Sequence, residues 1–140
     1  MKEKEEKLQK LYMEFQVLEQ QIKQLEKQNT MLNNQLMELM MTNQGLEDTK
    51  KIKEGTEILT PLSNGIYAKA QLKDSKNLIV NVGSSITVVK DVNSAKKMIE
   101  DQIEEIKKLQ ENLVDQLQTQ TTKAASLEQE INTIASEIKK

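Results

Sequence analysis

Leucine recurs along the first third of the chain at the spacing of a coiled coil. Counted from Leu8 as heptad position a, the stripe advances in alternate steps of three and four residues, and each of its six d positions is leucine. So narrow a stripe, kept over more than five heptads, is typical of a coiled coil rather than of a helix in a globular core. We predict a coiled-coil helix over residues 1–55, with lysines in its last turns and Gly55 as its left-handed cap. The residues of this first seam are Leu8, Leu11, Phe15, Leu18, Ile22, Leu25, Asn29, Leu32, Leu36, Leu39, Asn43 and Leu46.

The last third of the chain carries a second stripe with the same period. We predict a coiled-coil helix over residues 93–140, because Asn93 or Ser94 can cap its start and Lys139 and Lys140 oppose the negative end of its dipole. The residues of this second seam are Ile99, Ile103, Ile106, Gln110, Leu113, Leu117, Gln120, Ala124, Leu127, Ile131, Ile134 and Ile138.

The two seams have matched lengths, which predicts that the helices pair antiparallel. If Lys53 lies opposite Val92, then Leu8 lies opposite about residue 137, and both chain ends meet at a free tip. Polar residues interrupt both seams. They fit register-setting layers, which is the preferred interpretation, or looser segments that let the helices flex. These residues are Asn29, Asn43, Gln110 and Gln120.

The middle of the chain changes from helical to strand periodicity. We predict a short strand over residues 57–60 that is ended by Pro61, because proline has no N–H to donate to a ladder. Three further strands are predicted over residues 66–73, 78–82 and 86–90, with polar turns between them. The sequence therefore predicts two β-hairpins between two long helices. The fold class is α+β, with a long antiparallel two-helix coiled coil and the hairpins at one end.

The predicted hairpins carry more apolar residues than the helices can cover. An isolated two-stranded hairpin is marginally stable in water, and unpaired strand edges invite partners. We therefore expect residues 56–92 to be an oligomerisation region whose hairpins form a sheet with other subunits. The residues assigned to this role are Ile58, Leu62, Ile66, Leu72, Leu78, Val80, Val82, Ile86 and Val88.

Composition argues against an enzyme. The chain has no cysteine and no histidine, so no Cys–His or Ser–His–Asp relay, disulfide framework or imidazole-bound zinc is available. Its glycines are too far apart for a phosphate-binding loop, and we expect no cofactor and no metal. The basic residues are all lysine and the net charge is −2, which disfavours nucleic-acid binding. We also expect no membrane segment and a cytoplasmic protein, because no signal peptide or long apolar run is present.

The order of the predicted elements resembles that of the prefoldin family. The entry to the first hairpin, Gly55–Leu62, its second strand, Gly65–Ala70, and the second hairpin around Val80–Ser84 carry the resemblance. Two hairpins indicate the α class, whereas β-class subunits have one hairpin. The short chain, with lysine as its basic residue throughout, most resembles archaeal α-class members, with a eukaryotic homologue as the alternative. Residues 63–65 depart from the family, which more often has glycine directly after Pro-Leu.

The resemblance implies a hexamer of two α-class and four β-class subunits, with six coiled coils hanging from a double β-barrel. Such a complex captures unfolded polypeptides at the coiled-coil tips without ATP and passes them to a group II chaperonin. The implied partners are thus β-class subunits, unfolded polypeptides and the chaperonin. The alternative is a structural scaffold or an adaptor subunit of a larger complex.

The client-binding tip is expected where the chain ends meet. Most of its residues are also seam residues, for which mutual burial is the simpler interpretation, although terminal turns open easily. Tyr12 and Met13 lie off the seam and are the better candidates for direct contact, since methionine adapts to many partners. The residues of the predicted tip are Leu8, Leu11, Tyr12, Met13, Phe15, Leu127, Ile131, Ile134 and Ile138.

Overall fold

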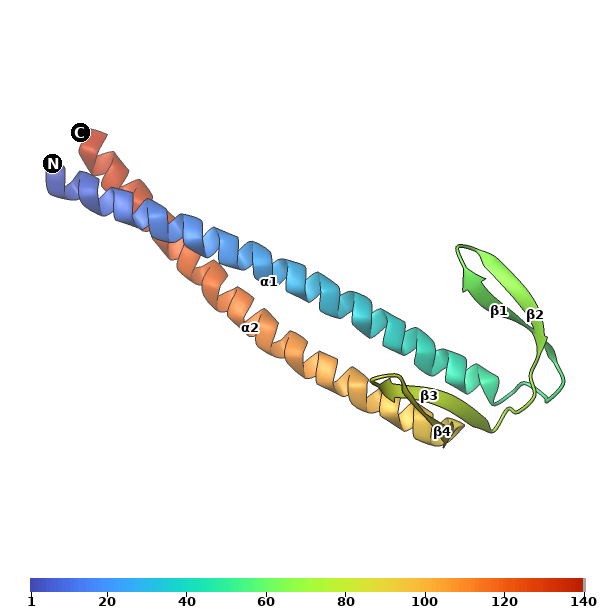
Figure 1. Cartoon of the computed structure of the whole chain (residues 1–140). Coiled ribbons are helices and arrows are strands. Elements are labelled where there is room, and N and C mark those ends of the chain that lie inside the picture. The colour runs from blue at the N-terminus through green and yellow to red at the C-terminus, as the bar shows by residue number, and fades with distance from the viewer. Residues whose placement is uncertain (140) are drawn as a thin grey trace. The chain divides into compact units, whose positions relative to one another are not determined.

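Two long helices flank four strands in the computed structural model, which describes residues 1–139 (Figure 1). The elements are α1 Lys2–Thr49, β1 Glu57–Ser63, β2 Ile66–Gln71, β3 Asn77–Gly83, β4 Ile86–Asp91 and α2 Val92–Lys139. The predicted α+β fold class, with a two-helix coiled coil and two β-hairpins, is confirmed. The predicted role of Lys140 at the helix end lies outside the described residues.

Packing divides the chain into two compact units. The first contains Met1–Gln35 together with the chain from Ile106 onward, and the second contains Leu36–Glu105. In the first unit the start of α1 and the end of α2 lie side by side (Figure 1). The Lys4–Glu137 ion pair and the Asn33–Gln110 hydrogen bond together show that the two helices run antiparallel in this unit, as the seams predicted.

Burial follows both predicted seams. Every one of the seam positions of α1 and α2 is buried or half-buried, whereas nearly all other helical positions are exposed. The alignment is shifted from the predicted one, because Glu137 pairs with Lys4, Glu130 pairs with Lys7 and Gln110 bonds to Asn33. The prediction placed Lys53 opposite Val92, whereas α1 ends at Thr49. The heptad pattern thus located the stripes but not their exact alignment.

The predicted end of α1 at Gly55 is wrong. The Thr49 hydroxyl donates a hydrogen bond to the carbonyl of Gly45 (2.7 Å), and tight turns follow, with Ile52 N–H donating to the Thr49 carbonyl (3.2 Å). Gly55 has a φ of +85° but does not cap the helix. Its N–H donates to the carbonyl of Leu72 (2.7 Å), at the base of the first hairpin. The helix ends before Gly55 because the N–H group of Gly55 bonds to the first hairpin and not to a helical carbonyl.

The two hairpins repeat each other at an interval of twenty residues. Strands β1 and β2 pair antiparallel from Glu57↔Gln71, and β3 and β4 pair from Asn77↔Asp91, with the same register throughout. Each pairing has an irregularity at the same place, between Pro61 and Ser63 and between Asn81 and Gly83. Both are two-stranded sheets, so each leaves its outer strand edges without partners among the described residues. The middle of the chain is therefore a structural duplicate.

Strand β1 continues through Pro61, contrary to the predicted end at residue 60. Pro61 pairs with Tyr67, and the strand reaches Ser63. Proline is tolerated in an edge strand or at a bulge, where its missing N–H interrupts no ladder bond. A two-stranded sheet consists of edge strands alone, which makes this position permissive.

The hairpin turns have the same backbone form with different residues. Asn64 and Gly65 have φ of 48° and 79°, and Ser84 and Ser85 have φ of 52° and 61°. Two central residues with positive φ define the type I′ turn that suits the twist of a hairpin. Asn-Gly adopts this form with little strain, whereas two serines do not.

Aspartates organise the backbone at the two ends of the second hairpin. Asp74 Oδ1 accepts hydrogen bonds from the N–H groups of Lys76 (2.8 Å) and Asn77 (3.1 Å), which confirms the predicted turn. Asp91 Oδ1 accepts one from the Ser94 N–H (2.6 Å) and is the N-cap of α2, so the predicted caps at positions 93 and 94 are wrong. These N–H bonds hold the pKa of both carboxyl groups below the usual aspartate value.

Candidate functional site

The tip of the first unit is built on a cluster of buried apolar side chains from both helices. Leu11 and Leu18 of α1 pack with Ala124 and the leucine and isoleucines of α2, and the exposed fraction of Ile131 is only 4%. Leu8, Phe15 and Ile138 are partly buried against this cluster. Of the nine residues predicted for the tip, seven are thus brought together, and their apolar surface is turned toward one another.

Tyr12 and Met13 are the two predicted tip residues that remain exposed. Their exposed fractions are 49% and 63%, and Val17, one turn further along α1, is 56% exposed. Met13 and Val17 line a shallow groove of about 440 Å³ between the helices. The remaining lining residues are Glu14, Leu18, Gln21, Lys123 and Leu127. The groove offers a small apolar surface with one charge of each sign beside it.

Two ion pairs join the helices at the tip. Lys4 Nζ lies 3.2 Å from Glu137 Oε2, and Lys7 Nζ lies 3.7 Å from Glu130 Oε1. The four side chains are roughly half exposed. In both pairs the lysine belongs to α1 and the glutamate to α2.

A single hydrogen bond between uncharged side chains crosses the helices within the described part of the first unit. Gln110 Nε2 donates to Asn33 Oδ1 (2.6 Å), beside Asn29 in an open polar groove of about 650 Å³. The predicted polar interruption is therefore real, although Gln110 selects Asn33 rather than a seam asparagine. The oxygen of Gln120 is buried without a partner among the described residues, so only one of the polar seam residues in this unit makes a cross-helix bond.

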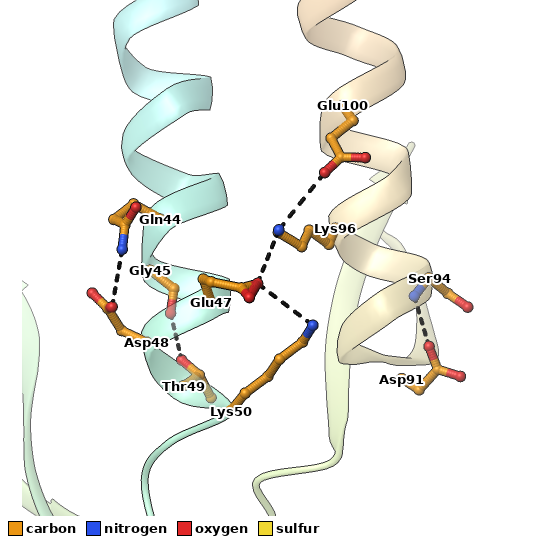
Figure 2. A network of polar contacts seen from close by, with 10 residues as sticks. All are labelled: Gln44, Gly45, Glu47, Asp48, Thr49, Lys50, Asp91, Ser94, Lys96 and Glu100. Carbon is orange, nitrogen blue, oxygen red and sulfur yellow. Dashed lines mark hydrogen bonds and ion pairs between the residues drawn. The ribbon is translucent and has the colours of Figure 1, made fainter.

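In the second unit an ion-pair network joins the last turns of α1 to the first turns of α2 (Figure 2). Glu47 Oε2 lies 2.9 Å from Lys96 Nζ and 3.5 Å from Lys50 Nζ, and Lys96 also meets Glu100 at 3.8 Å. The hydrogen bond from Lys96 is the main reason that the pKa of Glu47 is lowered, and the same bond raises the pKa of Lys96. These shifts stabilise the charged forms of both groups, so the network positions helices and offers no group poised for proton transfer.

The predicted assembly residues divide between half-buried and exposed positions. Within the second unit, five of the nine are half-buried. Four at the turn ends of the hairpins are strongly exposed: Leu62 65%, Ile66 61%, Val82 50% and Ile86 58%. The described chain alone therefore does not cover this apolar surface.

The β3–β4 hairpin has a second apolar face, which was not predicted from the sequence. Ile79 and Val89 face each other across the strands and are 78% and 70% exposed. The equivalent pair on the first hairpin is Leu59 and Lys69, with Leu59 62% exposed. The signal was present, because the nearly unbroken apolar runs around 78–82 and 86–89 are typical of strands that are covered on both faces.

Residues 1–139 contain neither a candidate metal site nor a membrane-spanning helix. No group of three or more His, Cys, Asp or Glu side chains in this range is placed to hold a metal ion. No helix in the same range is long and apolar enough to cross a membrane.

The helices and hairpins together define a class of protein. A paired coiled coil joined to two incompletely covered β-hairpins is the architecture of a coiled-coil assembly subunit. A family model described as "Prefoldin subunit" matches residues 18–137. The chain therefore belongs to the prefoldin family, a family of chaperone subunits.

Curated relatives from the α class of the prefoldin family match the chain over most of their length, so the chain belongs to this class. The chain is similar to prefoldin subunit alpha of Methanococcus vannielii, with 27% identity over 96% of this chain and 90% of the relative. It is also similar to prefoldin subunit alpha of Pyrococcus horikoshii, with 34% identity over 82% of this chain and 81% of the relative.

A solved structure supports the fold. The cryo-EM structure of filamentous PFD from Methanocaldococcus jannaschii matches with a TM-score of 0.72 and 21% identity. The match covers 80% of this chain and 93% of that chain. At this identity the similarity bears on the fold alone.

Proposed function

We propose that this chain is a subunit of an ATP-independent holdase. In this proposal, coiled-coil tips bind unfolded polypeptides and the complex delivers them to a group II chaperonin. The observation that carries it is the pairing of a tip with accessible apolar side chains, Tyr12, Met13 and Val17, with a separate region of uncovered sheet. The first feature suits client contact and the second suits assembly.

The proposed assembly is a hexamer of two α-class and four β-class subunits. Residues 56–92 contain its oligomerisation region, while the helices α1 and α2 form the coiled-coil arm. Uncovered strand edges and exposed apolar side chains such as Ile79 and Ile86 support this division. Pairing with further strands satisfies the edges and removes the apolar faces from water.

Client capture is proposed to depend on many weak contacts. One groove of about 440 Å³ is too small and too open to hold a long unfolded segment tightly. Several arms on one platform raise the effective concentration of each tip near the client, which increases avidity without strong individual sites. Exposed methionine suits such a surface because its side chain adapts to different sequences.

The experiment measures aggregation of a denatured protein in the presence of this chain mixed with a β-class subunit and no nucleotide. We expect the wild-type complex to delay light scattering, and the Tyr12→Ser, Met13→Ser, Val17→Ser variant to lose most of this delay. The matched control is Met41→Ser, because Met41 is 72% exposed on the same helix but lies outside the tip. Each variant is first checked for assembly by size-exclusion chromatography with light scattering.

Equal activity of the tip variant and the wild type would exclude these side chains as client contacts. An assembled complex that does not delay aggregation at all would favour the alternative function, a scaffold or adaptor. Such a protein would show one tight partner in place of many weak clients. Transfer to a chaperonin is measured separately, as chaperonin-dependent recovery of the client's activity.

A further inference from the structure

The first turns of α1 carry no apolar anchor. All of Met1–Lys7 is exposed, and the first partly buried side chain is Leu8. The contacts to α2 that are found in this part of the described chain are the ion pairs of Lys4 with Glu137 and of Lys7 with Glu130. Residues 1–7 of α1 are therefore held to α2 by charge, and apolar packing begins at Leu8 on α1 and Ile138 on α2.

The surface behind these ion pairs is apolar and hidden. Leu11 and Ile134 are 8% exposed and Ile131 is 4% exposed. These residues were predicted to touch clients, yet in the closed tip they touch one another. A client reaches them only when the helix ends separate.

Two of the paired charges oppose the dipoles of their own helices. Lys4 lies near the positive N-terminus of α1, and Glu137 lies near the negative C-terminus of α2. The charges that suit the dipoles are Glu3 and Glu5 in the first turn of α1 and Lys139 in the last turn of α2. None of these three makes a described ion pair across the tip. The unfavourable charges are thus the ones used for cross-helix contact, so separating the helices also removes the compensation that keeps each end helical.

We propose that these two ion pairs form a latch, made of Lys4, Lys7, Glu130 and Glu137, that closes the apolar cluster of the tip. Breaking the latch makes both helix ends fray more often and so increases the exposure of the cluster to an unfolded polypeptide. Exposed ion pairs are weak and are screened by salt, so the latch opens readily and responds to ionic strength. The client part of this inference rests on the proposed holdase function, while the opening of the tip does not.

Hydrogen exchange of the assembled complex tests the opening. We expect the Lys4→Gln, Lys7→Gln variant at low salt to show roughly two- to tenfold faster amide exchange in residues 8–12 and 130–138 than the wild type. The matched control, Lys2→Gln with Lys10→Gln, removes the same charge from the same helix end outside the latch. The reciprocal variant, Lys4→Glu with Glu137→Lys, restores the pair with reversed sign and is expected to keep the tip closed. Wild-type exchange is expected to approach that of the open variant in high salt.

A covalent lock tests the connection to client capture. The natural chain has no cysteine, so Lys4→Cys with Glu137→Cys is joined specifically by a short bis-maleimide. We expect the locked complex to suppress aggregation less than the same variant blocked with a monofunctional maleimide. We expect the open variant to suppress it more than the control at low salt.

The outcomes separate the two proposals. Unchanged exchange in the open variant overturns the latch, whatever the chaperone assay shows. Faster exchange with equal capture by open, locked and control complexes overturns the claim that the latch governs capture, and leaves the holdase proposal standing. If no complex suppresses aggregation, the holdase proposal fails, and the exchange experiment still decides whether the latch exists.

Discussion

Large apolar residues are buried at the tip of this chain and exposed on its hairpins. At the tip, a stripe on each helix buries its partner, so that Ile131 is 4% exposed. On the hairpins, Ile79 and Val89 are 78% and 70% exposed. The tip finds its apolar partner within the chain, and the hairpins do not. The difference teaches that one sequence encodes a self-sufficient packing unit and a surface that the described chain leaves uncovered.

Replacing Ile131 by alanine should produce the largest change in the stability of the isolated chain. The substitution leaves a cavity in the tip cluster, so we expect the free energy of unfolding to fall by about 2–4 kcal/mol. Thermal melts followed by circular dichroism measure the effect. Met13→Ala, at a side chain 63% exposed, is the control and should change stability by less than about 0.5 kcal/mol. Equal losses of unfolding free energy in the two variants would show that Ile131 is not part of a buried cluster.

Val89→Lys should impair assembly instead. The substitution gives the second hairpin the charge that Lys69 gives the first at the equivalent position. If this face is covered in the complex, burying an unpaired ammonium group should weaken association with a β-class subunit by about tenfold or more. Light scattering of the mixed subunits measures it, and melts of the isolated chain should stay unchanged. Asn77→Lys, at the end of β3, is the matched control. Normal assembly of Val89→Lys would show that this face stays in water.

Exchanging the residues of the two hairpin turns tests whether positive φ at serine destabilises the second hairpin. Ser84→Asn with Ser85→Gly places an Asn-Gly turn in the second hairpin, and should stabilise it by about 1 kcal/mol by relieving positive φ at serine. Asn64→Ser with Gly65→Ser should destabilise the first hairpin by a similar amount. Hydrogen exchange of the strand amides reports each hairpin separately. Changes of the same sign in both would refute the strain argument.

Acid should weaken the Glu47–Lys96 network, with the smallest effect of the set. The pKa of Glu47 is lowered from 4.5 in the folded chain, so its stabilising contribution is present above that value and is lost as the pH falls through the folded pKa. The pKa of Lys96 is raised from 10.5, so its contribution is present below that value and is lost only in stronger alkali. Between about pH 7 and pH 3, the melting temperature of the wild type should therefore fall slightly more than that of Glu47→Gln. Parallel curves for the two proteins would argue against the network.

The regular parts of the fold were predictable, because they depend on periodicity. The heptad stripe located every buried position of the seams, and alternation with turn residues located both hairpins. The end of α1 was not predictable from local preference, since Gly55 is a good helix cap in isolation. Its N–H is used by Leu72, a contact between segments far apart in sequence. Pro61 was read as a strand end for a related reason, because only the open edge of a two-stranded sheet makes it tolerable.

The candidate sites were predictable as regions and less so as residues. The seam pattern alone cannot distinguish a tip residue that meets a client from one that meets the opposite helix, and Leu11 and Ile134 have the latter position here. The second apolar face at Ile79 and Val89 was overlooked because strict alternation was applied where the apolar run is continuous. A strand with one face in water would carry polar residues at positions 79 and 89, and the apolar residues found there indicate a second apolar face.

The charges beside the tip groove have a further consequence for how the arm is aligned. Lys7 meets Glu130, and one heptad inward the order is reversed, with Glu14 on α1 and Lys123 on α2 lining the groove together. A slip of one heptad in one direction would set Lys7 against Lys123, and a slip in the other would set Glu14 against Glu130. Hydrophobic stripes tolerate such slips because every heptad resembles the next. Each slip would keep only one lysine–glutamate contact, Lys4 with Glu130 or Lys7 with Glu137, and would add a contact between like charges. The alternating charge order therefore favours the observed alignment over its neighbours, which leucine alone would accept equally.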